Sequence, residues 1–252
     1  MEEIRKPFQG VKNIIRFNWH FYAMAIGLVL FLAFVAIIVQ DPLRVLLIIS
    51  AAVVLASTII SLLVSLYIYD LSGLYKFKWI DSLPTDQLIL NIHAGFDETS
   101  ALLQSRFKSA ELVAMDFYDS DKHTEVSIKR ARAAYPPYPN TKHAKTNALN
   151  LPNESVDKIF VLLAAHEIRD EAERVLFFKE LARILKPAGL IYVTEHLRDI
   201  PNFLAFNLGF FHFYSKSAWL RTFRQANICL QQEIKLTPFL STFTLHKNGT
   251  AP

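Results

Sequence analysis

The sequence contains little cysteine, little glycine and no concentrated charge of one sign. Its single cysteine, Cys229, cannot form a disulfide within the chain, which is typical of a protein from a reducing compartment. The formal net charge is only +4, without blocks of like charge or a repeat of basic and aromatic residues. These features exclude a disulfide-stapled fold and argue against nucleic acid as a partner.

Two long uncharged apolar runs, residues 21–39 and 45–69, occupy much of the first third of the chain. At a rise of about 1.5 Å per residue, each run is long enough to cross the roughly 30 Å hydrocarbon core of a bilayer as a helix. The polar connection between them contains Pro42, which does not continue a helix. We therefore expect a transmembrane hairpin over 21–70, between an N-terminal segment 1–20 and a linker 71–86.

Two other interpretations of these runs are a cleaved signal peptide and a hairpin buried in a soluble core. The first run is too long for a signal peptide and is followed directly by the second run. The buried hairpin remains an alternative. Small residues in the second run (Ala51, Ala52, Ala56) also permit close packing of a second copy, so a homodimer is possible.

Basic residues lie mainly outside the two runs. Arg44 alone lies in the connection, whereas Arg5, Lys6, Lys12, Arg16, Lys76 and Lys78 lie at the opposite ends of the runs. The positive-inside rule then places both termini and the C-terminal part in the cytoplasm. We expect a multi-pass protein of the inner or plasma membrane, with the lipid bilayer as its partner.

Strand-like and helix-like segments alternate in the rest of the chain. Strands are expected at 87–93, 111–116, 156–163 and 190–194, and helices at 98–107, 122–134, 170–185 and 215–226. Two final strands, near 228–236 and 239–246, are adjacent and can pair antiparallel. The alternation predicts an α/β domain over 87–252, with a mostly parallel, Rossmann-like sheet covered by helices on both faces. Ligands of such sheets bind at the carboxyl ends of the strands.

Two stretches carry a family resemblance. Leu-Pro-Asn-Glu-Ser-Val-Asp at 151–157 resembles the approach to the fourth strand of class I S-adenosylmethionine-dependent methyltransferases. Residues 180–193 resemble the helix, Lys-Pro-x-Gly turn and fifth strand that follow in that family. The resemblance extends more weakly back to Leu88. It implies a seven-stranded sheet, S-adenosylmethionine as cofactor and methyl transfer as the reaction.

The resemblance also implies which residues bind the cofactor. Asp116, after the second strand, takes the position of the acid that accepts hydrogen bonds from the ribose. The other implied cofactor-binding residues are Asn91, His93 and Gly95 after the first strand, Asn147 and Ala148 at the adenine position, and Ala164 after the fourth strand. The first loop, Asn-Ile-His-Ala-Gly-Phe-Asp at 91–97, departs from the acid and alternating glycines of the family.

Histidine and glutamate follow both the fourth and the fifth strands, as His166-Glu167 and Glu195-His196. Neighbouring strand ends bring such groups together, and we name these four residues as candidate catalytic groups. A histidine near its ordinary pKa can take a proton from the methyl acceptor. The same cluster can instead hold a divalent metal or be a structural polar network, and no metal ligands are assigned. Asp170 is expected to cap the following helix.

The stretch 201–214 is expected to be a loop that is unusually rich in aromatic residues. It is either core packing or an apolar lid that opens toward the bilayer. For the second case we name five candidate substrate-binding residues: Arg198, Phe206, Phe210, Phe211 and His212.

These features predict a membrane-anchored methyltransferase for a hydrophobic, membrane-resident acceptor such as a quinone, an isoprenoid or a lipid. An alternative is another S-adenosylmethionine-dependent or metal-assisted group transfer on a quinone. A third is an inactive lipid-binding or scaffold module, for which the glycine-poor loop is the main support.

Overall fold

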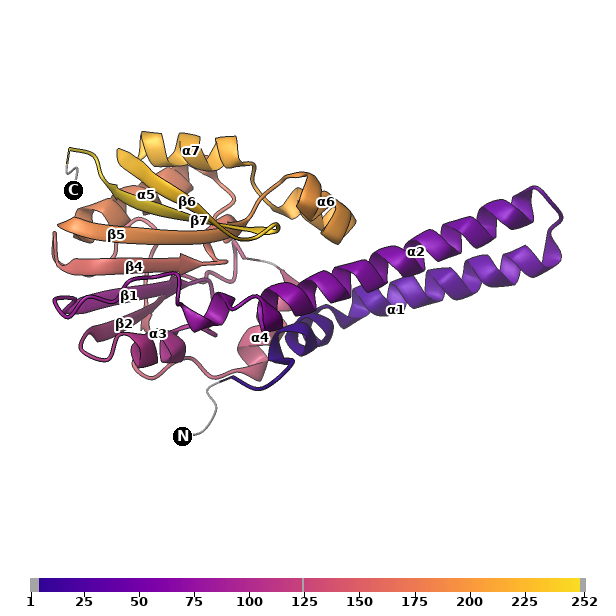
Figure 1. Cartoon of the computed structure of the whole chain (residues 1–252), viewed down its shortest axis with the longest axis horizontal. Coiled ribbons are helices and arrows are strands. Elements are labelled where there is room, and N and C mark those ends of the chain that lie inside the picture. The colour runs from indigo at the N-terminus through magenta and orange to yellow at the C-terminus, as the bar shows by residue number, and fades with distance from the viewer. Residues whose placement is uncertain (1–4, 124, 250–252) are drawn as a thin grey trace.

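The computed structural model describes residues 5–123 and 125–249 and shows an α/β domain from which a helical hairpin projects (Figure 1). The hairpin consists of α1 (Gln9–Ile38) and α2 (Leu43–Leu66). A π-helical turn, η1 (Tyr67–Leu71), and a 3-10 turn, η2 (Leu74–Lys76), lead into the domain. Both helices are long and apolar enough to cross a membrane, and at most 6% of their most apolar windows is buried. This exposure contradicts the alternative of a hairpin buried in a soluble core.

The first helix begins earlier than the predicted span, at Gln9 instead of residue 21. Its backbone leaves the helical conformation at Asn18 (φ −115°, ψ 19°), and the Asn18 amide donates a hydrogen bond to the carbonyl oxygen of Ile14. Before this break, Asn13 and Phe17 are buried against the α/β domain. Part of the expected N-terminal segment is therefore helical and packed, while residues 1–4 lie outside the described residues.

One sheet of seven strands forms the centre of the domain, in the order β3-β2-β1-β4-β5-β7-β6. The strands are β1 (Leu88–His93), β2 (Glu111–Asp116), β3 (Lys142–His143), β4 (Val156–Leu162), β5 (Leu185–His196), β6 (Ile228–Thr237) and β7 (Leu240–Lys247). The strands from β3 to β5 pair in parallel, whereas β7 pairs antiparallel with both β5 and β6. The sheet is therefore mixed, and the expected antiparallel final pair is confirmed.

Helices cover the sheet. They are α3 (Ser100–Arg106), α4 (Val126–Ala134), α5 (Glu171–Ile184), α6 (Ile200–Phe206) and α7 (Lys216–Gln225). Four of those described, α3, α4, α5 and α7, overlap the ranges predicted to be helical. Asp170 caps α5 by accepting a hydrogen bond from the Glu173 backbone N–H at 2.7 Å, as expected. Ser215 caps α7 in the same way.

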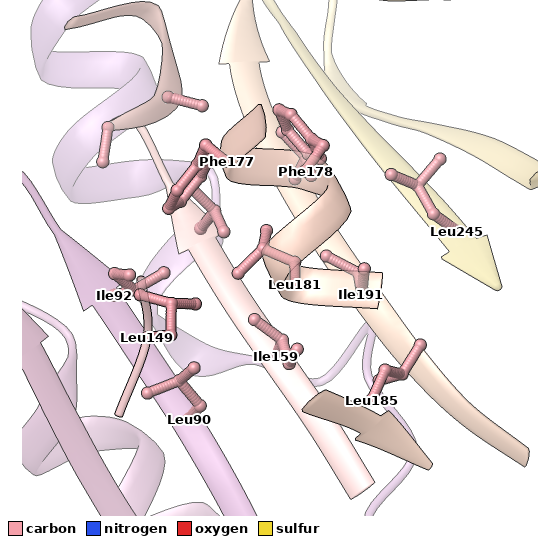
Figure 2. Close-up of a cluster of buried hydrophobic side chains, with 14 of the residues drawn as sticks. Leu90, Ile92, Leu149, Ile159, Phe177, Phe178, Leu181, Leu185, Ile191 and Leu245 are labelled. Atoms are coloured by element: carbon pink, nitrogen blue, oxygen red, sulfur yellow. The ribbon is translucent and has the colours of Figure 1, made fainter. Parts of the chain in front are cut away.

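The core has two layers because successive side chains of a strand point to opposite faces. Ile159 and Ile191 pack on one face with Phe177 and Phe178 of α5 (Figure 2). Their neighbours on the same strands pack on the other face, where the Phe160 and Tyr192 rings stack 5.4 Å apart. All four strand residues are at most 5% exposed, so both faces are covered.

Two segments differ from the expectations. The predicted turn at 186–189 is part of β5, because α5 passes directly into the strand at Leu185. Between the pairs Val156–Leu185 and Lys158–Leu190, β4 advances by two residues and β5 by five, so the turn sequence becomes a bulge in the strand. The predicted aromatic loop is mostly helical: Asp199 caps α6, and a 3-10 turn, η4 (Asn207–His212), follows.

Candidate active site

The carboxyl ends of β1, β2, β4 and β5 lie beside the base of the hairpin. Tyr69 in η1 contacts His196 at the end of β5, and Asn13 and Phe17 of α1 contact the region after β1 through Glu98 and Phe96. The apolar helices thus approach the edge of the sheet at which α/β domains bind ligands.

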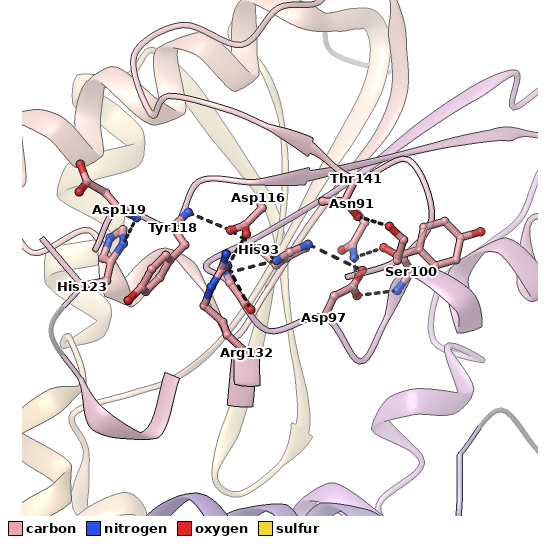
Figure 3. A network of polar contacts seen from close by, with 12 residues as sticks. Asn91, His93, Asp97, Ser100, Asp116, Tyr118, Asp119, His123, Arg132 and Thr141 are labelled. Carbon is pink, nitrogen blue, oxygen red and sulfur yellow. Dashed lines mark hydrogen bonds and ion pairs between the residues drawn. The ribbon is translucent and has the colours of Figure 1, made fainter. Parts of the chain in front are cut away.

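The loop after β1 is built by buried polar side chains (Figure 3). The Asn91 amide is 1% exposed and donates to the hydroxyls of Thr99 and Ser100 at 2.9 and 2.8 Å. Oδ1 of Asp97 accepts the backbone N–H groups of the same two residues, both at 2.9 Å, and so begins α3. Asn91, a predicted cofactor-binding residue, therefore supports the loop from within.

His93 and Asp97 carry two buried polar atoms for which the described residues offer no hydrogen-bond partner. Nδ1 of His93 accepts from the Gly95 N–H at 3.2 Å, so the ring proton of the neutral histidine lies on Nε2. This Nε2 lies 3.7 Å from Oδ2 of Asp97. Burial lowers the pKa of His93, which keeps the ring neutral. The loop therefore holds one unused N–H donor beside one unused carboxylate oxygen.

Asp116 ends β2 and lies beside Arg132, which also donates to the Gly95 carbonyl oxygen (Figure 3). Oδ1 of Asp116 accepts from the Tyr118 backbone N–H at 2.9 Å, and Oδ2 accepts from the Arg132 guanidinium. Gly95 has φ +92°, and a Cβ atom there would lie 2.7 Å from Nη1 of Arg132. The guanidinium also lies 4.4 Å above the Tyr118 ring. Arg132, which the sequence did not single out, therefore fills the space between two predicted cofactor-binding residues.

The remaining predicted cofactor-binding residues lie apart from this loop. Asn147 and Ala148 are exposed in a tight turn after β3, where the Ala148 N–H donates to the Lys145 carbonyl oxygen. Ala164 is 3% exposed and belongs to the hydrophobic core at the end of β4.

His166, Glu167 and Glu195 meet at the ends of β4 and β5, as the sequence predicted. His166 and Glu167 lie in a short 3-10 turn, η3 (Ala165–Glu167). Nδ1 of His166 lies 2.6 Å from Oε2 of Glu195, and its backbone N–H donates to Oε1 of the same carboxylate. Nε2 of His166 lies 3.1 Å from Oε1 of Glu167. Glu195 is only 1% exposed, so its carboxylate is held firmly against the ring.

His212 joins this cluster from η4, although it was expected only as a substrate-binding residue. Its Nε2 lies 3.6 Å from Oε1 of Glu167, and its Nδ1 lies 2.7 Å from Oε1 of Glu125. Glu125, just before α4, was not anticipated, because nothing in the sequence connects it to residues 40 and more positions away. We call His166, Glu167, Glu195, His212 and Glu125 the polar cluster.

Opposite charges determine the protonation of the polar cluster. Burial lowers the pKa of His166, but Glu195 and Glu167 outweigh this effect and raise the pKa to about 10. Burial raises the pKa of Glu167, but hydrogen bonds from His166 and His212 hold it well below its ordinary value. Burial also lowers the pKa of His212, but hydrogen bonds with Glu125 and Glu167 outweigh this effect and raise the pKa. Without a further ligand the cluster thus holds protonated imidazoles between ionised carboxylates.

His196 does not join the polar cluster, because it follows Glu195 on the strand and points to the other face. Its Nδ1 lies 3.0 Å from the Phe239 carbonyl oxygen and 3.2 Å from Oδ1 of Asn202. Both are acceptors, so Nδ1 carries the proton and Nε2 accepts from the Tyr69 hydroxyl at 2.9 Å. Burial lowers the pKa of His196 to about 4, so the ring is neutral at neutral pH.

The other predicted substrate-binding residues lie in α6 and η4 or just before them. Arg198 donates to the Phe211 carbonyl oxygen at 2.6 Å, which ties the two ends of this segment together. Phe206 packs edge-on against His196, with ring centroids 5.2 Å apart. Phe210 and Phe211 pack against each other, and Phe211 is 59% exposed. Phe206 therefore packs beside His196 at the end of β5, whereas Phe211 is exposed.

Glu98 connects the loop after β1 to the start of the hairpin. Its Oε1 accepts from Arg5 at 3.0 Å and from Asn13 at 2.9 Å, and its Oε2 accepts from the Tyr75 hydroxyl at 3.1 Å. A second connection runs through α4, where Arg130 donates to the Phe17 carbonyl oxygen at 2.7 Å. Through Glu98, the loop is thus hydrogen-bonded to the start of α1 and to the η2 turn that follows α2.

One protein family and several solved structures are similar to this chain. Residues 90–193 match the family described as "Methyltransferase domain". Similar solved structures include a SAM dependent methyltransferase from Aquifex aeolicus (15% identity, TM-score 0.49, covering 75% of this chain and 97% of that chain). SAM-dependent methyltransferases from Methanosarcina mazei (17%, 0.48, 66% and 94%) and Mesorhizobium loti (14%, 0.47, 70% and 98%) are also similar. Curated proteins gave no match. Over residues 90–193 the chain is thus similar to a methyltransferase domain.

Proposed function

We propose that the chain is an S-adenosylmethionine-dependent methyltransferase that is anchored in a membrane by α1 and α2 and methylates a hydrophobic acceptor residing in that membrane. The observation that carries the proposal is the hydrogen bond between Tyr69 and His196. It joins the end of the apolar hairpin to the carboxyl end of a central strand, so the site lies where the hairpin leaves the bilayer.

The surface of the hairpin supports the membrane part of the proposal. Large apolar side chains along both helices are about half exposed or more, among them Phe31 (62%), Ile37 (77%) and Val53 (61%). Such a continuous apolar surface is unfavourable in water and favourable in lipid. We retain the proposed division into a segment 1–20, a hairpin 21–70, a linker 71–86 and a domain 87–252. The positive-inside rule supports cytoplasmic termini in an inner or plasma membrane.

The α6–η4 segment supports the choice of a hydrophobic acceptor. It lies beside α2 (Figure 1), and it exposes Leu204 (63%), Leu208 (82%) and Phe211 (59%) on its surface. Phe206 and Phe213 of the same segment pack on His196 in the site. An apolar acceptor that leaves the bilayer beside α2 would therefore contact apolar side chains along its whole path to the polar cluster. Quinones, isoprenoids and lipids have this chemistry.

The residues after β1 and β2 fit S-adenosylmethionine. Its amino-acid end carries a carboxylate and an ammonium group, and the loop holds an unused donor on His93 and an unused acceptor on Asp97. Asp116 would accept hydrogen bonds from the ribose hydroxyls once Arg132 releases Oδ2. When bound, the cofactor supplies an electrophilic methyl group. Gly95 keeps the loop free of a Cβ atom on this side.

The polar cluster would receive the polar atom of the acceptor. Glu167 and His166 lie just after the carboxyl end of β4, and His212 reaches Glu167 from η4. The cluster offers ionised carboxylates that can bind an acceptor hydroxyl or amine and take up its proton during transfer. We propose Glu167 and Glu195 for this role, with His166 orienting both carboxylates and His212 as a contact to the acceptor. His196 would act as a positioning residue through Tyr69.

The first test is calorimetric titration of the full chain, in detergent micelles, with S-adenosylmethionine and S-adenosylhomocysteine. We expect binding of both, and the variant Asp116→Asn should weaken it at least tenfold because a charged hydrogen bond is worth about 1.5–3 kcal/mol. Asp121→Asn removes the same charge from an exposed position and should leave affinity unchanged. Binding that is equal in both variants would contradict the role of Asp116.

The second test is transfer of labelled methyl groups from S-adenosylmethionine in proteoliposomes that contain quinols, polyprenyl compounds or phospholipids. We expect label in an organic-phase product. If label enters only water-soluble acceptors while the cofactor binds, the enzyme is a methyltransferase but the proposal of a membrane-resident acceptor fails.

A further inference from the structure

We propose that His166, Glu167 and His212 bind one divalent transition-metal ion. One donor atom from each residue lies within 4.8 Å of the others. Oε1 of Glu167 lies between the two rings, 3.1 Å from Nε2 of His166 and 3.6 Å from Nε2 of His212. Ligands of one ion at about 2.1 Å lie roughly 3–3.5 Å apart, so these spacings need only small adjustments. Two imidazoles and one carboxylate are a donor set that suits Zn²⁺ and Fe²⁺.

Both histidines are already oriented as metal ligands. Nδ1 of His166 lies 2.6 Å from a Glu195 oxygen, and Nδ1 of His212 lies 2.7 Å from a Glu125 oxygen. A carboxylate at Nδ1 keeps one proton there, so an ion that displaces the proton from Nε2 can bind the lone pair of that nitrogen. Both Nε2 atoms face the same oxygen of Glu167. The structure thus holds two carboxylate–histidine pairs that converge on a third carboxylate.

The polar cluster is buried on one side and partly exposed on the other, as in catalytic metal sites and unlike closed structural zinc sites. The Glu195 and Glu167 side chains are 1% and 8% exposed, whereas the His212 side chain is 25% exposed. The three protein ligands therefore leave coordination positions open on the side of His212. Catalytic sites keep such open positions for water or substrate, while structural zinc sites fill all four with protein groups.

Arg169 competes with the proposed ion. Its guanidinium contacts both ring nitrogens of His212, at 2.6 Å from Nε2, and lies 3.6 Å from Oε1 of Glu125. The Arg169 side chain is 42% exposed, so it can turn outward when an ion binds. Removal of this charge should therefore strengthen metal binding.

The metal site does not depend on the proposed acceptor. If both hold, the ion would bind an acceptor hydroxyl and lower its pKa, which favours acceptors with phenolic or enolic oxygen. The hydroxyl proton would pass to a carboxylate of the polar cluster, and the oxygen would then take the methyl group as S-adenosylhomocysteine leaves.

The test is calorimetric titration of metal-stripped full chain with ZnCl₂, in detergent at pH 7.5. We expect one ion per chain and a micromolar or lower dissociation constant. His212→Gln and Glu167→Gln should weaken binding at least a hundredfold, and Glu125→Gln, which removes an orienting carboxylate, about ten- to hundredfold. Arg169→Gln should strengthen binding several-fold. His143→Gln removes an exposed histidine on β3 and is the matched control.

The proposal is overturned if the chain binds no Zn²⁺, or if His212→Gln and Glu167→Gln bind it as tightly as the His143→Gln control. His212 lies in an exposed 3-10 turn, so its variant remains informative if substitution of the buried Glu167 prevents folding. Titration of the same samples with S-adenosylmethionine separates the two proposals. If the chain binds the cofactor but no Zn²⁺, the metal-site proposal fails and the methyltransferase proposal stands. If it binds Zn²⁺ but no cofactor, the methyltransferase proposal fails and the metal site stands.

Discussion

The hydroxyl group of Tyr69 donates a hydrogen bond of 2.9 Å to Nε2 of His196, across 127 positions of sequence. Tyr69 lies one turn beyond the end of α2, and His196 is the last residue of β5. His196 directly follows Glu195, which holds the ring of His166. A movement of the hairpin at the bilayer would therefore reach the polar cluster through two adjacent residues of one strand.

Replacement of Tyr69 by phenylalanine should cost about 1–3 kcal/mol of unfolding free energy, because it leaves a buried acceptor on His196 without a partner. Thermal unfolding in detergent micelles measures this loss. Tyr67→Phe removes a hydroxyl from a residue that is 42% exposed, and its effect should stay within about 0.5 kcal/mol. Equal effects of the two substitutions would mean that the hydrogen bond contributes nothing to stability.

His196 should make the fold sensitive to acid. Its pKa is about 4 in the folded chain, below the ordinary value of 6.5. Between these values the unfolded chain binds a proton that the folded chain does not, so stability falls as the pH falls from about 6.5 to about 4. The contribution amounts to on the order of 3 kcal/mol.

The variant His196→Gln cannot bind this proton, so it should lose less stability than the wild type between pH 7.5 and pH 4.5. The comparison uses the change with pH within each protein, because the substitution also alters packing at neutral pH. Parallel losses in the two proteins would show that other groups cause the acid sensitivity.

Arg132→Gln should increase the affinity for S-adenosylmethionine. The guanidinium occupies Oδ2 of Asp116, the oxygen that we propose for the ribose. The Arg132 side chain is 39% exposed, so the ion pair is worth at most about 1 kcal/mol, and its loss should improve affinity up to about fivefold. Calorimetric titration measures the change. Weaker binding would instead show that Arg132 itself holds the cofactor.

Glu98→Ala should destabilise the fold by about 3 kcal/mol, because it leaves the charge of Arg5 unpaired in a site where both side chains are less than 15% exposed. It should also weaken cofactor binding, since Glu98 adjoins the loop after β1. Glu171→Ala breaks an exposed ion pair with Arg221 and should cost less than about 1 kcal/mol. If Glu98→Ala lowers the free energy of unfolding less than Glu171→Ala does, the contacts of Glu98 with the start of the hairpin do not stabilise the fold.

Much of the fold follows from local patterns in the sequence. β2 has the predicted bounds, because a short apolar run between polar residues contains all the information that a buried strand needs. The segment 201–214 was expected to be a loop, since its density of aromatic residues hid the helix cap at Asp199. At 186–189 the turn sequence became a bulge, because pairing with β4 outweighs the local preference of Pro187 and Gly189.

The site was predictable only where strand order determined it. His166 and Glu195 were expected to meet because β4 and β5 are neighbours, and they do. The strand period of two should have separated His196 from Glu195, which point to opposite faces. Glu125 and Tyr69 reach the site through tertiary packing across tens of residues, and no local signal in the sequence reports such contacts.

The break in α1 at Asn18 divides the helix into a part fixed to the domain and a part that can cross the bilayer. The second part, 19–38, has a length of about 30 Å, which equals the hydrocarbon thickness. In the membrane anchorage that we propose, a domain joined this firmly would keep a fixed height above the lipid, and its reactive centre would sample one layer of the membrane. We expect the enzyme to select its acceptor by the depth of the reacting atom in the bilayer as well as by the chemistry of that atom. Transfer rates in bilayers of different acyl-chain length should then pass through a maximum, whereas a flat profile would mean that the domain moves freely.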